Sequence, residues 1–248
     1  MISNYGLKYK GELCLDLHLP EKSEFDLFVY FHGGGLCGGK RGGVEPFAET
    51  LAERGIATAT VEYRMYPNAK FPDFIEDGAD AIRWLKDNIS AFGSCKRVLV
   101  GGSSAGGYIS MMLCFDSRFL ERVGMKPTDI DAYIHDAGQP TSHFNVLKEL
   151  GRDSRRVIVD ETAPMYFVGE AEKYAPMLFI VSDNDMFGRY EQTLLMLKTL
   201  EHFGHKESIR LEIMHGEHCS YVYSKDGQGK GVLANVILSF LDNLGFTV

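Results

Sequence analysis

Val98-Leu-Val-Gly-Gly-Ser-Ser-Ala-Gly-Gly-Tyr108 joins an apolar run to a G-x-S-x-G motif, and an unbroken apolar segment follows it. The run predicts a buried strand and the following segment a buried helix. A strand, a tight turn and a helix form the context in which G-x-S-x-G presents a nucleophile. The turn needs small residues at Gly102 and Gly106, and it leaves the Ser104 hydroxyl at its tip. The alternative is an ordinary loop rich in glycine and serine, because short motifs also occur by chance.

The rest of the chain alternates between predicted strands and predicted helices. Alternating apolar and polar residues over 12–19 predict a half-exposed strand near an edge of the sheet. Other strands are predicted at 27–31, 56–61, 130–134, 177–181 and 209–214, and helices at 45–54, 73–89, 143–150, 189–202 and 233–244. This order predicts a single α/β domain over residues 1–248, with a mostly parallel sheet covered by helices on both faces.

The composition argues against several classes of partner. Hydrophobic residues make up 45% of the 248 residues, enough for a sizeable core, and the net charge of -8 argues against nucleic acid or an anionic membrane as a partner. No apolar run reaches transmembrane length, and residues 1–10 lack the apolar region of a secretory signal. Five cysteines without a C-x-x-C pair predict free thiols in a reducing compartment, so we expect a cytoplasmic protein.

A serine nucleophile needs a base to take its proton, and that base is usually a histidine oriented by a carboxylate. In a parallel sheet such groups belong on loops at the carboxyl ends of strands. The loop after the strand at 177–181 offers two carboxylates, Asp183 and Asp185. Both are candidates for the orienting acid, and a helix cap or a solvated turn is the structural alternative.

The loop after the strand at 209–214 offers two histidines. His215 directly follows the strand, where packing would fix it, whereas His218 lies beyond Gly216 and can reach back over the sheet. We therefore favour His218 as the base. A metal site built from Glu217 and a histidine is the alternative, but no third ligand is evident, so the sequence predicts no bound metal.

Consecutive glycines occur at His32-Gly33-Gly34-Gly35, after another predicted strand. Their backbone N–H groups can point into a cavity without a side chain in the way, and with the N–H of Ala105 they would form an oxyanion hole. A flexible loop or a phosphate cradle is the alternative. No G-x-x-x-x-G-K-[ST] motif is present, so we expect no nucleotide and no other cofactor. His32 is expected to brace the loop rather than act as a base.

Together these motifs resemble the α/β-hydrolase superfamily, in particular the hormone-sensitive-lipase-like esterases and small carbohydrate esterases. The resemblance rests on the glycine loop, the G-x-S-x-G turn and four stretches between them: Glu62-Tyr-Arg-Met-Tyr-Pro67, Phe71-Pro72, Glu76-Asp77, and Ala81 with Trp84-Leu85. It implies an α/β-hydrolase fold with an eight-stranded, mostly parallel sheet, one early antiparallel strand and little or no cap. The chain order of nucleophile, acid and base is also that of this fold.

The resemblance implies a catalytic triad and an oxyanion hole. It assigns the nucleophile to Ser104, the acid to Asp185 and the base to His218. The oxyanion donors that it implies are the backbone N–H groups of Gly34, Gly35 and Ala105.

We therefore expect a serine carboxylesterase that acts on a small-molecule ester. The segment Asp136-Ala-Gly-Gln-Pro-Thr-Ser-His143 is polar, which predicts an open site, acyl groups from acetyl to butyryl, and acetylated or feruloylated carbohydrates as substrates. The alternatives are an amidase of the arylformamidase type, a small serine peptidase and a non-catalytic binding protein on the same scaffold. Cys37 and Cys219 adjoin the predicted site residues, either as part of its lining or as inert packing.

Overall fold

The computed structural model describes residues 1–246 and contains one eight-stranded sheet, with the order β1-β2-β4-β3-β5-β6-β7-β8. The strands are β1 (Ile2–Lys10), β2 (Leu13–Leu19), β3 (Glu24–Phe31), β4 (Ile56–Val61), β5 (Ser94–Ser103), β6 (Ala132–Asp136), β7 (Met177–Asn184) and β8 (Ile209–Glu217). β2 is antiparallel to both of its neighbours, and the other neighbouring strands pair in parallel. The predicted sheet, with one early antiparallel strand, is therefore confirmed.

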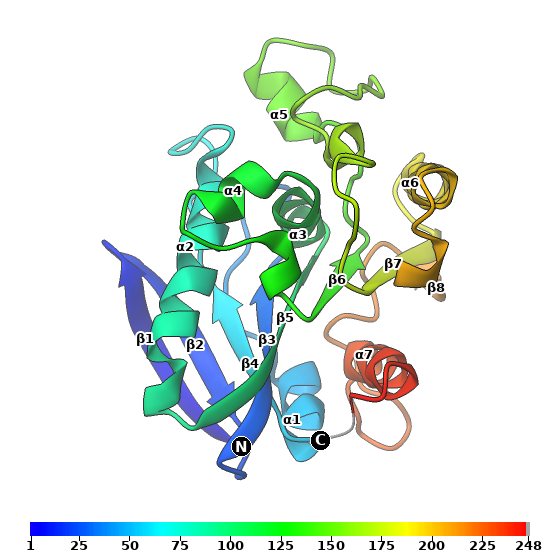
Figure 1. The fold of residues 1–248 in the computed structure, drawn as a ribbon. Coiled ribbons are helices and arrows are strands. Elements are labelled where there is room, and N and C mark those ends of the chain that lie inside the picture. The colour runs from blue at the N-terminus through cyan, green and yellow to red at the C-terminus, as the bar shows by residue number, and fades with distance from the viewer. Residues whose placement is uncertain (247–248) are drawn as a thin grey trace.

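Helices cover both faces of this sheet (Figure 1). The helices are α1 (Glu45–Glu53), α2 (Asp73–Asn88), α3 (Ala105–Phe115), α4 (Ser117–Glu121), α5 (Phe144–Glu149), α6 (Arg189–His202) and α7 (Val232–Asn243). Strand β3 shows the two faces: Val29 and Phe31 pack in the core under α2, α3 and α6, whereas Phe28 and Tyr30 pack in the core under α1 and α7. In the part of the chain that the structure describes, none of the helices combines the length and apolar character needed to cross a bilayer.

Strand β2 lies next to the edge of the sheet, as predicted, but it is largely buried rather than half-exposed. β1 forms the edge itself and pairs with β2 in antiparallel register. As a result the polar side chains of β2 are buried, with Asp16 5% and His18 2% exposed. Asp16 accepts hydrogen bonds from the Gly6 N–H at 2.8 Å and from Arg41 Nε at 2.9 Å, and Ser3 Oγ lies 2.9 Å from His18 Nδ1. The alternation of apolar and polar residues along β2 therefore reflects one apolar and one polar face, both of them buried.

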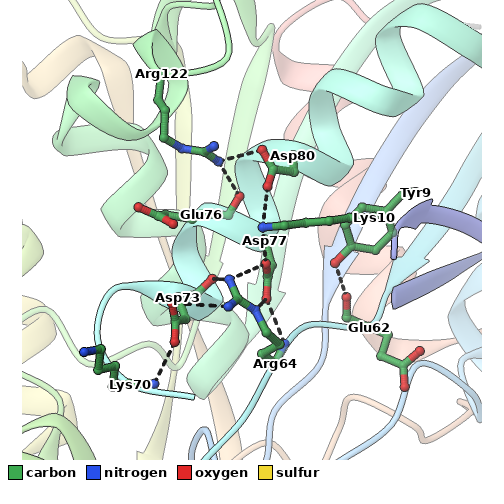
Figure 2. A network of polar contacts seen from close by, with 10 residues as sticks. All are labelled: Tyr9, Lys10, Glu62, Arg64, Lys70, Asp73, Glu76, Asp77, Asp80 and Arg122. Carbon is green, nitrogen blue, oxygen red and sulfur yellow. Dashed lines mark hydrogen bonds and ion pairs between the residues drawn. The ribbon is translucent and has the colours of Figure 1, made fainter. Parts of the chain in front are cut away.

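A cluster of charged side chains joins β1, the segment after β4 and α2, as Figure 2 shows. Asp77 on α2 is fully buried and accepts hydrogen bonds from Arg64 Nε and from Lys10 Nζ, each at 2.7 Å. Lys10 also pairs with Asp80, and Arg122 reaches the same Asp80 carboxylate, both at 2.6 Å. Because buried charges are tolerated when they are paired, this cluster holds α2 against the edge of the sheet.

The partners of Asp77 make its contribution dependent on pH. Burial by itself would raise the pKa of Asp77, but the hydrogen bonds from Arg64 and Lys10 hold that pKa below its ordinary value. A carboxyl group whose pKa is lower in the folded state than in the unfolded state, where it is about 4, stabilises the fold above that pH. The stabilisation is then lost as the pH falls through the lower, folded-state pKa.

We expect Asp77→Ala to lower the free energy of unfolding at pH 7 by roughly 2 kcal/mol, because Arg64 and Lys10 lose a buried partner although both still reach solvent. Urea titrations of both proteins at pH 7 and pH 3 measure this, and the difference should shrink at pH 3. Asp87→Ala is the matched control on the same helix, because Asp87 pairs with Arg83 at the surface; its loss should stay below about 0.5 kcal/mol. Equal losses in the two variants at pH 7 would contradict the role of the cluster.

Candidate active site

Ser104 occupies a strained turn between β5 and α3. Its backbone angles are φ 56° and ψ -112°, a left-handed region that residues other than glycine rarely adopt. The turn brings α3 against the end of β3: a Cβ on Gly106 would lie 1.9 Å from the carbonyl oxygen of Phe31, and one on Gly102 would lie 2.5 Å from the same atom. Any side chain at either position would force strand and helix apart. The structure therefore supplies the steric reason for both glycines of the motif.

The side chains of Ser104, His218 and Asp185 meet at the carboxyl end of the sheet. Ser104 Oγ lies 2.8 Å from His218 Nε2, and His218 Nδ1 lies 2.5 Å from Asp185 Oδ1. The Asp185 side chain is fully buried, and it also accepts hydrogen bonds from the N–H groups of Met186 at 2.7 Å and Ser182 at 3.2 Å. Burial tends to raise the pKa of Asp185, but these contacts, led by that from His218, hold it below its ordinary value.

The second aspartate and the second histidine form a pair of their own. His215 Nδ1 lies 2.5 Å from Asp183 Oδ2, and the N–H of Gly216 donates to the same carboxylate at 2.9 Å. The His215 side chain is 95% exposed. Of the two acid–histidine pairs that the sequence offers, only that of Asp185 and His218 contacts Ser104 within the described residues 1–246.

The glycine loop after β3 lies beside the turn that carries Ser104. The carbonyl of Gly34 accepts hydrogen bonds from the N–H groups of Cys37 and Gly38, both at 3.1 Å. Because a trans peptide is planar, this directs the Gly35 N–H the opposite way. Asn145 Nδ2 donates to the Gly35 carbonyl at 2.6 Å and so ties the loop to α5, a contact that no sequence motif signals. The N–H groups of Gly34 and Gly35 have no hydrogen-bond acceptor in residues 1–246.

His32 begins this loop and fixes it, as expected. The Tyr63 hydroxyl donates to the His32 carbonyl at 2.6 Å, and the two rings stack with their centroids 4.4 Å apart. His32 Nδ1 lies 2.7 Å from the carbonyl oxygen of Gly33. Burial lowers the pKa of His32, so its ring is neutral at pH 7 and contributes packing rather than charge.

A cavity of about 500 Å³ opens above Ser104. Its walls combine the glycine loop, His218 and the apolar side chains of Phe144, Met186, Val222 and Tyr223. Ligand pockets are typically concave and mostly apolar with a few converging polar groups, and this cavity has that character. Among residues 1–246 there is no cluster of three His, Cys, Asp or Glu side chains placed to hold a metal ion.

A family model described as the alpha/beta hydrolase fold matches residues 28–205. The chain belongs to the α/β-hydrolase family. This confirms the resemblance that the glycine loop, the G-x-S-x-G turn and the stretches between them indicate, and it agrees with the eight-stranded sheet.

The curated relatives of this family member include lipases and carboxylesterases. Lipase 2 of Moraxella sp. (strain TA144) is 27% identical over 194 residues, which cover 76% of this chain and 43% of the lipase. Probable carboxylesterase 6 of Arabidopsis thaliana is 37% identical over 102 residues, which cover 37% of this chain and 30% of that protein. The chain thus spans less than half the length of these relatives.

Solved structures of esterases share the whole fold. A thermophilic esterase from the Planctomycetes species Thermogutta terrifontis, with propionate bound, superposes with a TM-score of 0.76 at 20% identity, covering 97% of this chain and 93% of that one. Esterase B of Lactobacillus rhamnosis (HN001) gives a TM-score of 0.76 at 16% identity, covering 100% of this chain and 88% of the other. At these identities the likeness shows the fold.

Asp136, at the end of β6, forms a buried hydrogen-bond network beneath the site that the sequence analysis missed. The hydroxyls of Ser103 and Tyr221 both donate to its carboxylate, and Tyr30 donates to Ser103 Oγ at 3.0 Å. The Asp136 carbonyl accepts the N–H of Ser104 at 2.8 Å. Burial raises the pKa of Asp136 to about 6, although the two hydroxyls act in the opposite direction. The sequence did contain a signal for Asp136: it follows the predicted strand at 130–134, just as the candidate acids Asp183 and Asp185 follow the strand at 177–181.

The polar segment 136–143 does not line the site as predicted. Its polar side chains are buried and find hydrogen-bond partners inside the protein: Gln139 Nε2 donates to the Ser142 carbonyl at 2.9 Å, and Thr141 Oγ1 donates to Gln192 Oε1 at 2.6 Å. Small polar side chains can be buried at little cost when each finds such a partner. Phe144, just beyond the segment, is the side chain that reaches the cavity.

The two cysteines near the predicted site have different surroundings. Cys219 lines the cavity, with Sγ 3.6 Å from His218 Nε2, and burial raises the pKa of its thiol well above the ordinary value. Cys37 is exposed, and its Sγ lies 3.3 Å from Asn145 Nδ2.

We expect a fluorophosphonate probe to label Ser104 in the folded protein, because His218 can take the proton from its hydroxyl. His218→Ala should slow labelling at least a hundredfold and Asp185→Asn at least tenfold. His215→Ala and Asp183→Asn are matched controls of the same residue types and should label at the wild-type rate. Gel fluorescence over time measures all five proteins, and a greater loss in His215→Ala than in His218→Ala would overturn the assignment of the base.

Proposed function

We propose that this chain is a serine carboxylesterase that hydrolyses esters of short acyl groups through Ser104, His218 and Asp185. The observation that carries the proposal is the continuous chain of contacts, 2.8 Å from Ser104 Oγ to His218 Nε2 and 2.5 Å from His218 Nδ1 to Asp185 Oδ1. These contacts open onto the 500 Å³ cavity. The lipase and carboxylesterase names of its relatives support the same reaction class.

The contacts of His218 set its proton distribution. An ionised carboxylate can only accept, so the nitrogen that faces Asp185 carries the hydrogen, and Nε2 is left with a lone pair toward Ser104. Ser104 Oγ then attacks the ester carbonyl carbon while its proton passes to Nε2. The imidazolium that results is stabilised by the buried Asp185 carboxylate, and it returns the proton to the departing alcohol oxygen.

The carbonyl oxygen becomes negatively charged during this attack. The N–H groups of Gly34 and Gly35 border the cavity, and that of Ala105 belongs to the first residue of α3, where helix N–H groups have no partner within the helix. We assign the oxyanion hole to these three donors, because fixed dipoles aimed at developing charge lower the barrier without having to reorient. Water, deprotonated by His218, then attacks the acyl-enzyme, releases the carboxylic acid and regenerates Ser104.

Hydrolysis of p-nitrophenyl acetate and butyrate tests the proposal. Wild-type protein should turn over both, and Ser104→Ala should lower kcat by several orders of magnitude without a change in the unfolding transition. Ser90→Ala, a change of the same type at an exposed position, should have no effect. A folded wild-type protein that neither turns over esters nor reacts with fluorophosphonate would instead be a binding protein, and faster cleavage of matched anilides would indicate an amidase or a peptidase.

We expect the specificity constant to peak between acetyl and butyryl and to fall before octanoyl. Phe144 and Met186 line this cavity and also border a neighbouring space lined by arginines, so a longer uncharged chain must extend into solvent or into that charged space. Each methylene that stays in water forgoes about 0.8 kcal/mol of binding free energy. A series of p-nitrophenyl esters from acetate to decanoate measures this, and equal kcat/KM values on acetate and decanoate would contradict it.

Acetylated or feruloylated sugars remain a prediction for the natural substrate. The polar segment that motivated it is buried, so the leaving alcohol would have to be recognised elsewhere. Rates on an acetylated sugar and on a simple aryl acetate test the point directly, and equal rates would remove the carbohydrate role.

A further inference from the structure

A second cavity adjoins the one above Ser104. It encloses about 430 Å³ between the loop after α5 and the beginning of α6, and it shares the walls Phe144 and Met186 with the first cavity. The two cavities are therefore adjacent, and a ligand that extended past these two side chains would reach the second one. Three of its lining residues are arginines, Arg155, Arg156 and Arg189, and no Asp or Glu is among the described residues that line it. That is an unusual concentration of positive charge in a chain of net charge -8.

Arg189 is a buried cation without a carboxylate in contact. Its residue is 4% exposed, and its guanidinium donates to the Ala137 carbonyl and, at 3.4 Å, to Gln139 Oε1. No ion pair within residues 1–246 includes it. Arginine keeps its charge in proteins, and a buried charge is costly unless it is paired. The guanidinium therefore contributes positive charge to the wall of the cavity, which the buried Asp185 carboxylate offsets only in part because it makes no ion pair with Arg189.

Two further arginines border the cavity from the loop after α5. Arg155 Nη2 pairs with Asp153 at 2.8 Å, so its charge is largely satisfied. The Arg156 backbone donates to the Asp153 carbonyl at 3.1 Å, and its side chain has no ion-pair partner in the described part of the chain. Arg156 and Arg189 thus line the same cavity, and neither side chain has an ion-pair partner within residues 1–246.

We infer that this second cavity binds a carboxylate that the ester substrate carries several bonds from its scissile carbonyl. The inference rests on the proposed esterase function and narrows its substrate class. An arginine guanidinium presents parallel N–H donors that match a carboxylate, and a cavity wall of low dielectric strengthens the attraction. Phe144 and Met186 supply apolar contact for the methylenes between the two groups. A purely apolar chain of the same length would bring an uncharged end to two cations and gain nothing from them.

Two matched ester series test the inference. In the first, p-nitrophenyl monoesters of C4 to C8 dicarboxylic acids are compared with the ω-carboxamides of equal length, which differ only in charge. In the second, acetates of ω-hydroxycarboxylic acids are compared with acetates of the ω-hydroxyamides, which moves the carboxylate to the alcohol side. In at least one of the two series, kcat/KM for the acid should exceed that for the amide of equal chain length by at least about tenfold at low salt. This preference should weaken at 0.5 M NaCl.

Substitutions of Arg156 test whether the preference for the acid over the amide arises in the second cavity. Arg156→Gln should lower the ratio of acid to amide by roughly fivefold, and Arg156→Glu should reverse it. Arg83→Gln removes the same charge from α2, where it lines neither cavity, and should keep the wild-type ratio. An equal ratio in wild-type and in both Arg156 variants, or no preference for the acid at any length in either series, would overturn the inference.

Binding to Ser104→Ala protein separates this inference from the proposed reaction. Calorimetry with the same acids and amides reports affinity where no ester is cleaved. Tighter binding of the acid, abolished by adding Arg156→Glu, would support the cavity even if the wild-type protein hydrolysed none of the esters. Hydrolysis of neutral esters with equal affinity for acid and amide would retain the esterase and reject the carboxylate site.

Discussion

The backbone contact between α3 and the end of β3 is the constraint on which the site depends. The Gly106 backbone lies so close to the Phe31 carbonyl that no Cβ fits between them. To reach this contact the chain must turn sharply out of β5, which places Ser104 at a positive φ. The same contact fixes the position of the glycine loop, because this loop starts immediately after Phe31. The loop lies close to Ser104: a Cβ on Gly33 would lie 3.3 Å from the Cβ of Ser104. One close approach of main chain thus positions both the serine and the amides beside it.

Burial distinguishes two acid–histidine pairs that look equivalent in sequence. Strands β7 and β8 pair in parallel, so the residues after each strand emerge side by side, and the ladder becomes irregular between Ser182 and Asn184. Asp183 and His215 remain on the solvent side of this irregular end, whereas the Asp185 side chain is fully buried. An ion pair in solvent is weak and mobile, while a buried carboxylate with three donors holds a histidine in one orientation.

How far the sequence predicted this arrangement depends on the range of the interactions involved. The turn at Ser104, the glycine loop and the helix at 73–89 follow from local rules, and the structure contains each of them. Strand β2 lies near the edge as predicted, but it is buried rather than half-exposed, because its pairing with β1 is a tertiary contact that alternation does not encode. The polarity of 136–143 was likewise visible, but not that Gln139, Thr141 and Ser142 find buried hydrogen-bond partners, some of them in distant segments. The walls Phe144 and Met186 come from distant segments, so no motif could join them.

The Tyr221 hydroxyl on the Asp136 carboxylate has a consequence for how the site withstands local fluctuation. Strand β8 forms the edge of the sheet opposite β1 and is largely exposed, so its amides are expected to open at a low free energy. The loop that carries His218 begins where this strand ends. Three residues further on, the hydrogen bond from Tyr221 to Asp136 anchors the loop to the buried strand β6. Fraying of β8 can therefore proceed without releasing the loop. In hydrogen-exchange terms, the amides of β8 and the anchored segment around Val222 are expected to belong to different opening units, with the geometry of the candidate site tied to the slower one.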